Sequence, residues 1–120
     1  MLPQRYRLRS SHDFSVVVRR GTKTKQRDLV LYAHPRDSET TMIHGPRVGL
    51  IVSKSVGNAV GRHRVSRMLR HAFLFDTTNL DLDADVVIRA LPSAGSATTA
   101  ALAEQIRRGI AIVSHRGSLR

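Results

Sequence analysis

The stretch KSVGNAVGRHRVSRMLRHAF, residues Lys54–Phe73, decides the fold and points to the partner. Read as a helix with about 100° per residue, it gathers aliphatic side chains within one arc of roughly 100° and basic side chains within an opposed arc of roughly 120°. One side is expected to pack on a core, and the other presents a row of cations. The aliphatic arc holds Val65, Met68, Leu69 and Ala72, and the basic arc holds His63, Arg64, Arg67, Arg70 and His71.

These cations have no carboxylate near them in the sequence. No Asp or Glu occurs between Thr40 and Phe75, whereas an ordinary solvated helix mixes both signs and gains i,i+4 ion pairs. The 120 residues carry 20 Lys and Arg against 9 Asp and Glu, a formal net charge of +11. Such unpaired charge indicates a polyanionic partner, of which nucleic acid is the commonest.

Composition bounds the class of protein. The length fits one domain with a modest core, so we predict a single nucleic-acid-binding domain over residues 1–120. The absence of cysteine excludes disulfides, thiolate metal sites and thiol nucleophiles. No apolar run approaches the ~20 residues of a membrane span, and the start MLPQRYRLRSS lacks the apolar region of a secretory signal. We therefore expect a soluble, cytoplasmic protein.

The basic residues 1–9 have two open interpretations, a frayed flexible tail or an arm that lies along phosphates. The start of the basic segment is also open. The turn Val56-Gly57-Asn58 is either an ordinary capped helix start or a phosphate site, with Lys54 and Arg62 close enough in sequence to share the phosphate.

The rest of the sequence predicts an α+β fold. A cap at Ser10 or Ser11 and Gly21 at a natural C′ position bound a first helix. Apolar runs predict strands at 28–34, 47–53 and 86–90, with 47–53 in the centre of the sheet, and the polar, basic segment 22–27 is either a short edge strand or a loop. A loop at 35–46 and an acidic connection at 76–85 separate them.

A last amphipathic helix completes the predicted order α-β-β-β-α-β-α, a two-layer sandwich of a small mixed sheet with helices. Its apolar stripe holds Leu102, Ile106, Ile110 and Val113.

The sequence offers no self-contained catalytic site. Six histidines occur without an HExxH pattern, and neither Ser53 nor Ser55 lies in a GxSxG turn. The run Asp81-Leu-Asp83-Ala-Asp85 begins like a calcium loop but has Val86 where that loop needs glycine and Pro92 where it needs glutamate. We read it as a solvated acidic loop.

Phe14 and Tyr32 are two of only five aromatic residues. They belong either to the core or, if the first helix covers one edge of the sheet, to a cleft where nucleobases stack for roughly 1–3 kcal/mol each. The basic rim of that cleft would then hold Arg19, Arg20, Lys23, Lys25 and Arg27. Charge alone does not separate RNA from DNA.

The segment RVGLIVSKSVGNAVGRHRVSRMLRHAF resembles the signature region of the bacterial ribonuclease P protein component. The family has a strand, a Ser-Lys-Lys-x-Gly-Asn-Ala-Val turn and a helix with Arg-Asn-Arg-x-x-Lys-Arg-x-x-Arg. His-Asp-Phe and Arg-Arg-Gly near the start and DADVVIRALP later are also similar. Three positions depart: Ser55 and Ser66 replace usual lysines, and His63 replaces the usual asparagine.

The resemblance implies a protein subunit of an endoribonuclease that removes the 5′ leader of precursor tRNA, with Mg²⁺ held mainly by a catalytic RNA subunit. It also implies a left-handed crossover around the basic helix, where handedness rules alone favour a right-handed one. By position, the RNA-subunit face holds Lys54, Asn58, Arg62, His63, Arg64, Arg67 and Arg70. The leader cleft holds Phe14, Val18, Arg19, Lys23 and Tyr32, with Val18 where some relatives have a second aromatic.

Two other function classes stay open. A structural RNA-binding protein, such as a ribosomal protein or RNA chaperone, needs the same charge but no leader cleft. A DNA-binding regulator would need a helix and a tight turn before the basic helix, where the apolar run 47–53 stands instead. No membrane or obligate protein partner is indicated.

Overall fold

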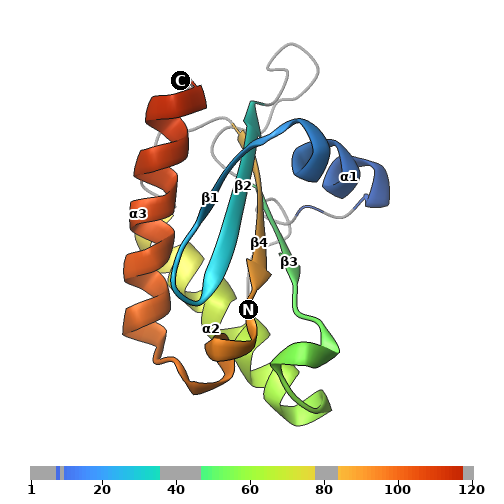
Figure 1. Cartoon of the computed structure of the whole chain (residues 1–120), viewed down its shortest axis with the longest axis vertical. Coiled ribbons are helices and arrows are strands. Elements are labelled where there is room, and N and C mark those ends of the chain that lie inside the picture. The colour runs from blue at the N-terminus through green and yellow to red at the C-terminus, as the bar shows by residue number, and fades with distance from the viewer. Residues whose placement is uncertain (1–7, 9, 36–46, 78–83, 118–120) are drawn as a thin grey trace.

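The computed structural model describes residues 8, 10–35, 47–77 and 84–117 (Figure 1). The element order is the predicted one, with two short 3₁₀ turns added. The helices are α1 (Ser11–Arg20), α2 (Ala59–Thr77) and α3 (Thr99–Gly117), and the 3₁₀ turns are η2 (Lys54–Val56) and η3 (Pro92–Ser96). The strands are β1 (Thr22–Lys25), β2 (Leu29–Pro35), β3 (Arg47–Ile51) and β4 (Ala84–Ala90).

The four strands form one mixed sheet in the order β1-β2-β4-β3. The pairs β1–β2 and β2–β4 are antiparallel, and β3–β4 is parallel. The prediction that the strand at 47–53 is central was wrong, because β3 lies at an edge and β4 is central. The apolar residues of β3 indicate that both of its faces are covered, as the packing of Val48 and Ile51 in the two clusters shows. Such burial does not determine whether a strand lies in the centre or at the edge of the sheet.

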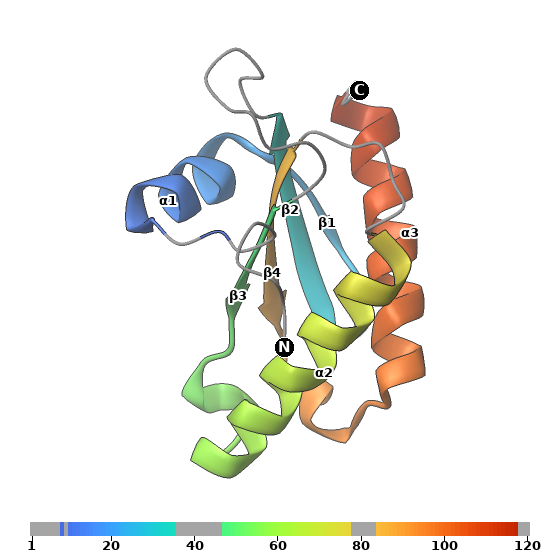
Figure 2. The ribbon, with the colours of Figure 1, turned by 180° about the vertical axis from the view of Figure 1, so that it is seen from behind.

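The connection from β3 through α2 to β4 is left-handed. In Figure 2, α2 lies in front of the sheet, both strands run downward, and the chain passes from β3 on the left to β4 on the right. Almost all parallel pairs use the opposite hand. The expectation drawn from the family resemblance is confirmed, and the general handedness rule would have failed here.

Helices α2 and α3 cover one face of the sheet (Figures 1 and 2). Alternate strand residues such as Leu31, Val86 and Ile88 point to that face and are fully buried. The predicted stripe of α3 is confirmed, since all four of its residues are buried in this core. Gly109 brings α3 close to the sheet, because a Cβ there would lie 3.2 Å from Leu31 Cδ1.

Helix α1 covers part of the other face and builds a second, smaller apolar cluster. Ser10 caps α1, with its hydroxyl accepting from the backbone N–H of His12 at 3.1 Å and of Asp13 at 3.4 Å. Gly21 ends the helix in an extended rather than left-handed conformation. Glycine is needed there because a Cβ would overlap the carbonyl oxygen of Val17 and lie 2.8 Å from that of Ala33.

The acidic connection predicted to run to Asp85 is shorter than expected. Asp85 belongs to β4, is 9% exposed, and lies opposite Arg47 of β3. Arg47 donates to both carboxylate oxygens, at 2.8 and 2.9 Å, and these bonds raise the pKa of its guanidinium. Arg47 also lies 4.0 Å from Asp13 of α1. The carboxylate is therefore a structural partner in the sheet and not part of a solvated loop.

Several predictions fall on residues outside the described ranges. These are most of the basic segment 1–9, the loop at 36–46, and the aspartates Asp81 and Asp83 of the acidic run. Leu8 is the exception in the first segment. It is 5% exposed in the smaller cluster, and its N–H donates to the Val48 carbonyl at 2.8 Å. Leu8 therefore packs against the domain and does not belong to a flexible tail.

Candidate nucleic-acid interface

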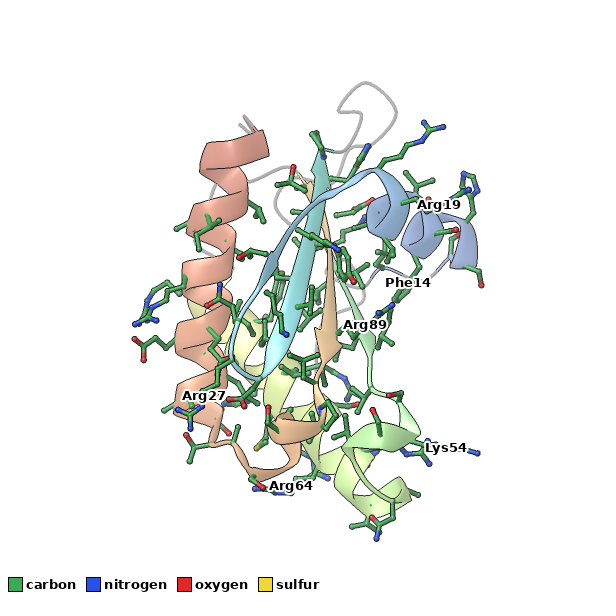
Figure 3. All side chains as sticks on the ribbon, viewed as in Figure 1. Phe14, Arg19, Arg27, Lys54, Arg64 and Arg89 are labelled. Atoms are coloured by element: carbon green, nitrogen blue, oxygen red, sulfur yellow. The ribbon has the colours of Figure 1, made fainter. Side chains whose placement is uncertain are left out.

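The sequence predicts one helix over Lys54–Phe73, and the structure divides this segment into two elements. Its first residues form η2, and α2 begins at Ala59 after a turn. Asn58 caps α2 by accepting the N–H of Gly61 at 2.9 Å. Because the backbone leaves β3 and turns before α2 begins, Lys54 sits at one corner of the molecule, ahead of the helix (Figure 3).

The two opposed sides of α2 are confirmed. Val65 and Leu69 are fully buried and Ala72 is 2% exposed, all within the larger core. On the other side the four side chains His63, Arg64, Arg67 and His71 are exposed, while Arg62 and Arg70 are half-buried. We call this basic side, together with Lys54 and Asn58, the α2 face.

Within the described part of the chain, no ion pair involves a cation of the α2 face. The ion pairs there join Arg47 to Asp85 and Asp13, and Arg108 to Glu104. The guanidinium of Arg64 donates to the Gly95 carbonyl of η3 at 3.0 Å, which holds the side chain in place and leaves its charge without a carboxylate. A guanidinium group whose charge has no carboxylate partner is available to pair with phosphate.

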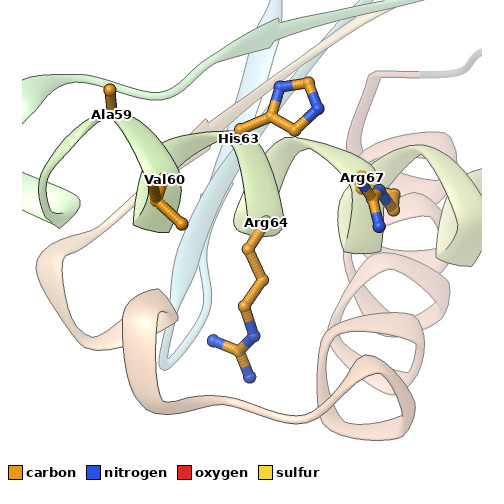
Figure 4. Close-up of a pocket in the computed structure, with 5 residues that line it drawn as sticks. All are labelled: Ala59, Val60, His63, Arg64 and Arg67. Atoms are coloured by element: carbon orange, nitrogen blue, oxygen red, sulfur yellow. The ribbon is translucent and has the colours of Figure 1, made fainter.

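An open pocket indents the α2 face (Figure 4). In this view Arg64 and Arg67 extend from successive turns of the helix, with Val60 nearer its start. Val60 is 79% exposed, so an apolar side chain stands among the cations. The pocket is lined by Ala59, Val60, His63, Arg64 and Arg67.

Arg62 is held differently from its neighbours. Its Nε is buried and has no hydrogen-bond partner among the described residues. A buried N–H without an acceptor is rare in folded proteins. Arg62 is therefore the cation of the α2 face whose hydrogen bonding this chain leaves incomplete.

The second candidate surface lies on the sheet face that carries α1. Phe14, Val18 and Tyr32 come together there in the smaller cluster, around Val87. Lys23 pairs in register with Tyr32 across β1 and β2, and Arg19 is exposed in the last turn of α1. We call this region, defined by Phe14, Val18, Arg19, Lys23 and Tyr32, the α1-side surface.

The aromatic side chains of the α1-side surface differ in what they offer. Tyr32 is only 6% exposed, and the guanidinium carbon of Arg89 lies 5.8 Å from the centre of its ring. Phe14 is half-buried. Arg89 is exposed in the otherwise buried β4, and sequence reasoning missed it as a site residue. The signal was present, since a lone cation in the apolar strand VVIRA must point to the less covered face.

The two surfaces are separate. Figure 3 shows the labels of Phe14 and Arg89 at about mid-height beside the sheet, and those of Lys54 and Arg64 at the lower end of the molecule. A strand and a 3₁₀ turn precede α2. The arrangement is therefore not a helix-turn-helix, which needs a helix before the recognition helix.

The described residues contain no group of three His, Asp or Glu side chains placed to hold a metal ion. In the same ranges, no helix is long and apolar enough to cross a membrane. The carboxylates of Asp13 and Asp85 lie against Arg47. The chemistry of the described surface is thus that of cations, amides and aromatic rings.

Comparison with known proteins adds a family to this geometry. The family described as Ribonuclease P matches residues 2–113. The ribonuclease P protein component of Rhodococcus erythropolis is 51% identical over 113 residues, covering 92% of this chain and 90% of that protein. The corresponding protein of Mycolicibacterium vanbaalenii is 47% identical over 116 residues, covering 97% and 96%.

Solved structures agree with the fold. The RNase P protein of Staphylococcus aureus superposes with a TM-score of 0.75 at 28% identity, covering 89% of this chain and 94% of that one. The RNase P protein of Thermotoga maritima gives a TM-score of 0.71 at 17% identity, covering 91% and 96%, which supports the fold alone.

Proposed function

Because the chain belongs to the ribonuclease P protein family, we propose that its α2 face binds the RNA subunit and its α1-side surface binds the 5′ leader of precursor tRNA. The chain is the protein subunit of bacterial ribonuclease P and takes part in processing that leader. The observation that carries the proposal is the α2 face, whose cations have no carboxylate partner among the described residues.

The α2 face suits the backbone of a folded RNA. Guanidinium groups bind phosphates through two parallel hydrogen bonds, and each neutralised phosphate releases counterions. The buried Nε of Arg62 has no acceptor among the described residues, and an RNA oxygen could supply one. The proposed contacts are Lys54, Asn58, Arg62, His63, Arg64, Arg67 and Arg70.

The α1-side surface suits a single strand without demanding a sequence. Phe14 offers an aromatic edge or face to a base, and Val18 extends the apolar area beside it. Tyr32 is nearly covered, so it supports the surface from below while Arg89 above it meets the base or phosphate. Arg19 and Lys23 neutralise phosphates at the rim.

The proposed division of labour leaves bond breaking to the RNA. The family resemblance implies Mg²⁺ as the ion that would activate water for hydrolysis, and Mg²⁺ prefers clustered carboxylate or phosphate oxygens. The described residues offer no such cluster, so they do not fit the role of holding the ion, and the RNA subunit would hold it. The protein would act in the cytoplasm, without an obligate protein partner.

Site-specific crosslinking of the assembled holoenzyme tests both surfaces. A photoreactive group at position 14 should capture the leader of precursor tRNA, and one at position 67 should capture the RNA subunit. Position 108 of α3, exposed and paired to Glu104, is the matched control and should capture neither efficiently. Capture of RNA from position 67 without any leader from position 14 would favour a purely structural RNA-binding role.

A further inference from the structure

The strand β3 carries a glycine directly beneath the ring of Phe14. A Cβ at Gly49 would lie 2.5 Å from Phe14 Cε1, 2.9 Å from Cε2 and closer still to Cζ. Real Cβ atoms do not approach other heavy atoms so closely. The ring therefore rests end-on against bare backbone, and any side chain at position 49 must displace it.

An ion pair also joins α1 to β3. Arg47, two residues earlier on the same side of β3, is held by Asp85 and lies 4.0 Å from Asp13 of α1. Asp13 directly precedes Phe14 in the helix. The strand β3 thus fixes the position of this turn of α1, and Gly49 determines how closely the Phe14 ring approaches the sheet (Figure 3).

We propose that Gly49 is a positioning residue for the leader, because its missing side chain lets the Phe14 ring seat at the depth where a base can stack on it. The inference rests on the proposed function of the α1-side surface and adds a residue that does not itself touch RNA. The three atoms nearest to such a Cβ all belong to the end of the Phe14 side chain and none to backbone, so an added methyl group acts first on the ring.

The experiment measures how much the leader adds to affinity. Holoenzyme binds a non-cleavable precursor tRNA with a full leader and one with a single leader nucleotide, and the ratio of the two affinities is compared between variants. Gly49→Ala should lower this ratio about fivefold, the lower end of what an aromatic–base stack contributes. Affinity for the RNA subunit should not change. Gly109→Ala, which adds a methyl on the opposite face of the sheet, should leave the ratio unchanged.

A double-mutant cycle with Phe14 separates this inference from the proposed function. If Phe14→Ala leaves the ratio at the wild-type value, the proposal that the α1-side surface binds the leader is wrong. If Phe14→Ala lowers the ratio, Gly49→Ala must have no further effect in that background. A Gly49→Ala ratio equal to wild type, or a loss that persists without the Phe14 ring, would overturn the positioning role.

A second variant covers the case in which Gly49→Ala does not fold. Phe14→Tyr keeps an aromatic ring and adds a hydroxyl at Cζ, the atom nearest to where a Cβ of residue 49 would stand. The ring must move away from Gly49. The ratio of the affinities for the full-leader and single-nucleotide-leader substrates should therefore fall, although the stacking surface is intact. A Phe14→Tyr holoenzyme with the wild-type ratio would contradict the proposal independently of Gly49→Ala.

Discussion

Replacing Arg64 and Arg67 together with alanine should weaken assembly with the RNA subunit and reduce its salt dependence. Both side chains are exposed on successive turns of α2, and neither has a carboxylate partner among the described residues. Each lost phosphate contact flattens the slope of log K against log salt by about 0.7–0.9. Two contacts therefore account for a slope change of about 1.4–1.8 and, at 0.1 M salt, a loss of about 25- to 60-fold in affinity.

The assay is a titration of labelled RNA subunit with protein at several salt concentrations. Arg20→Ala with Arg108→Ala is the matched control, because it removes the same charge from exposed positions outside the α2 face. Arg67→Ala alone should give about half of the slope change, which guards against an indirect effect of losing the Arg64 bond to Gly95. A double variant with the wild-type slope would refute the assignment of this face to phosphates.

Three further substitutions test the packing that holds the two surfaces. Leu69→Ala, at a fully buried position of α2, should lower the free energy of unfolding by about 2–5 kcal/mol in urea titrations, and a loss below that range would mean α2 is not seated as described. Gly21→Ala should cost about 1–3 kcal/mol by the same measurement, because its Cβ meets backbone oxygens of Val17 and Ala33; an unchanged stability would show that the α1–β2 approach is looser. Arg47→Met should cost about 2 kcal/mol by removing the bidentate partner of Asp85, with a neutral result pointing to a rearranged sheet edge.

The sequence predicted the elements well where a strong local pattern existed. The opposed arcs of α2 and the stripe of α3 follow from helical periodicity, and Ser10 follows from capping chemistry. Strand order lay beyond that reasoning. The apolar run of β3 indicated burial, and burial on both faces is available to an edge strand when helices lie above and below it.

The parts of the site that sequence could not supply are those that need three dimensions. Asp85 looked like one more member of an acidic run, yet the parallel register opposite Arg47 turns it into an ion-pair partner. Arg89 lies over Tyr32 only because β2 and β4 are neighbours. Gly49 lies in the strand of the segment that resembles the family, but its proposed role depends on Phe14 of α1, which packs against it. The left-handed crossover was predicted from the family resemblance, because the general rule for parallel strands favours the opposite hand.

Cleavage of precursor tRNA by a bacterial RNA subunit at low magnesium, with and without this protein, tests the central claim most directly. The account predicts that the protein accelerates cleavage at the 5′ end of the mature tRNA, and that the gain shrinks when the leader is cut to one nucleotide. Cleavage no faster than with the RNA alone would contradict it.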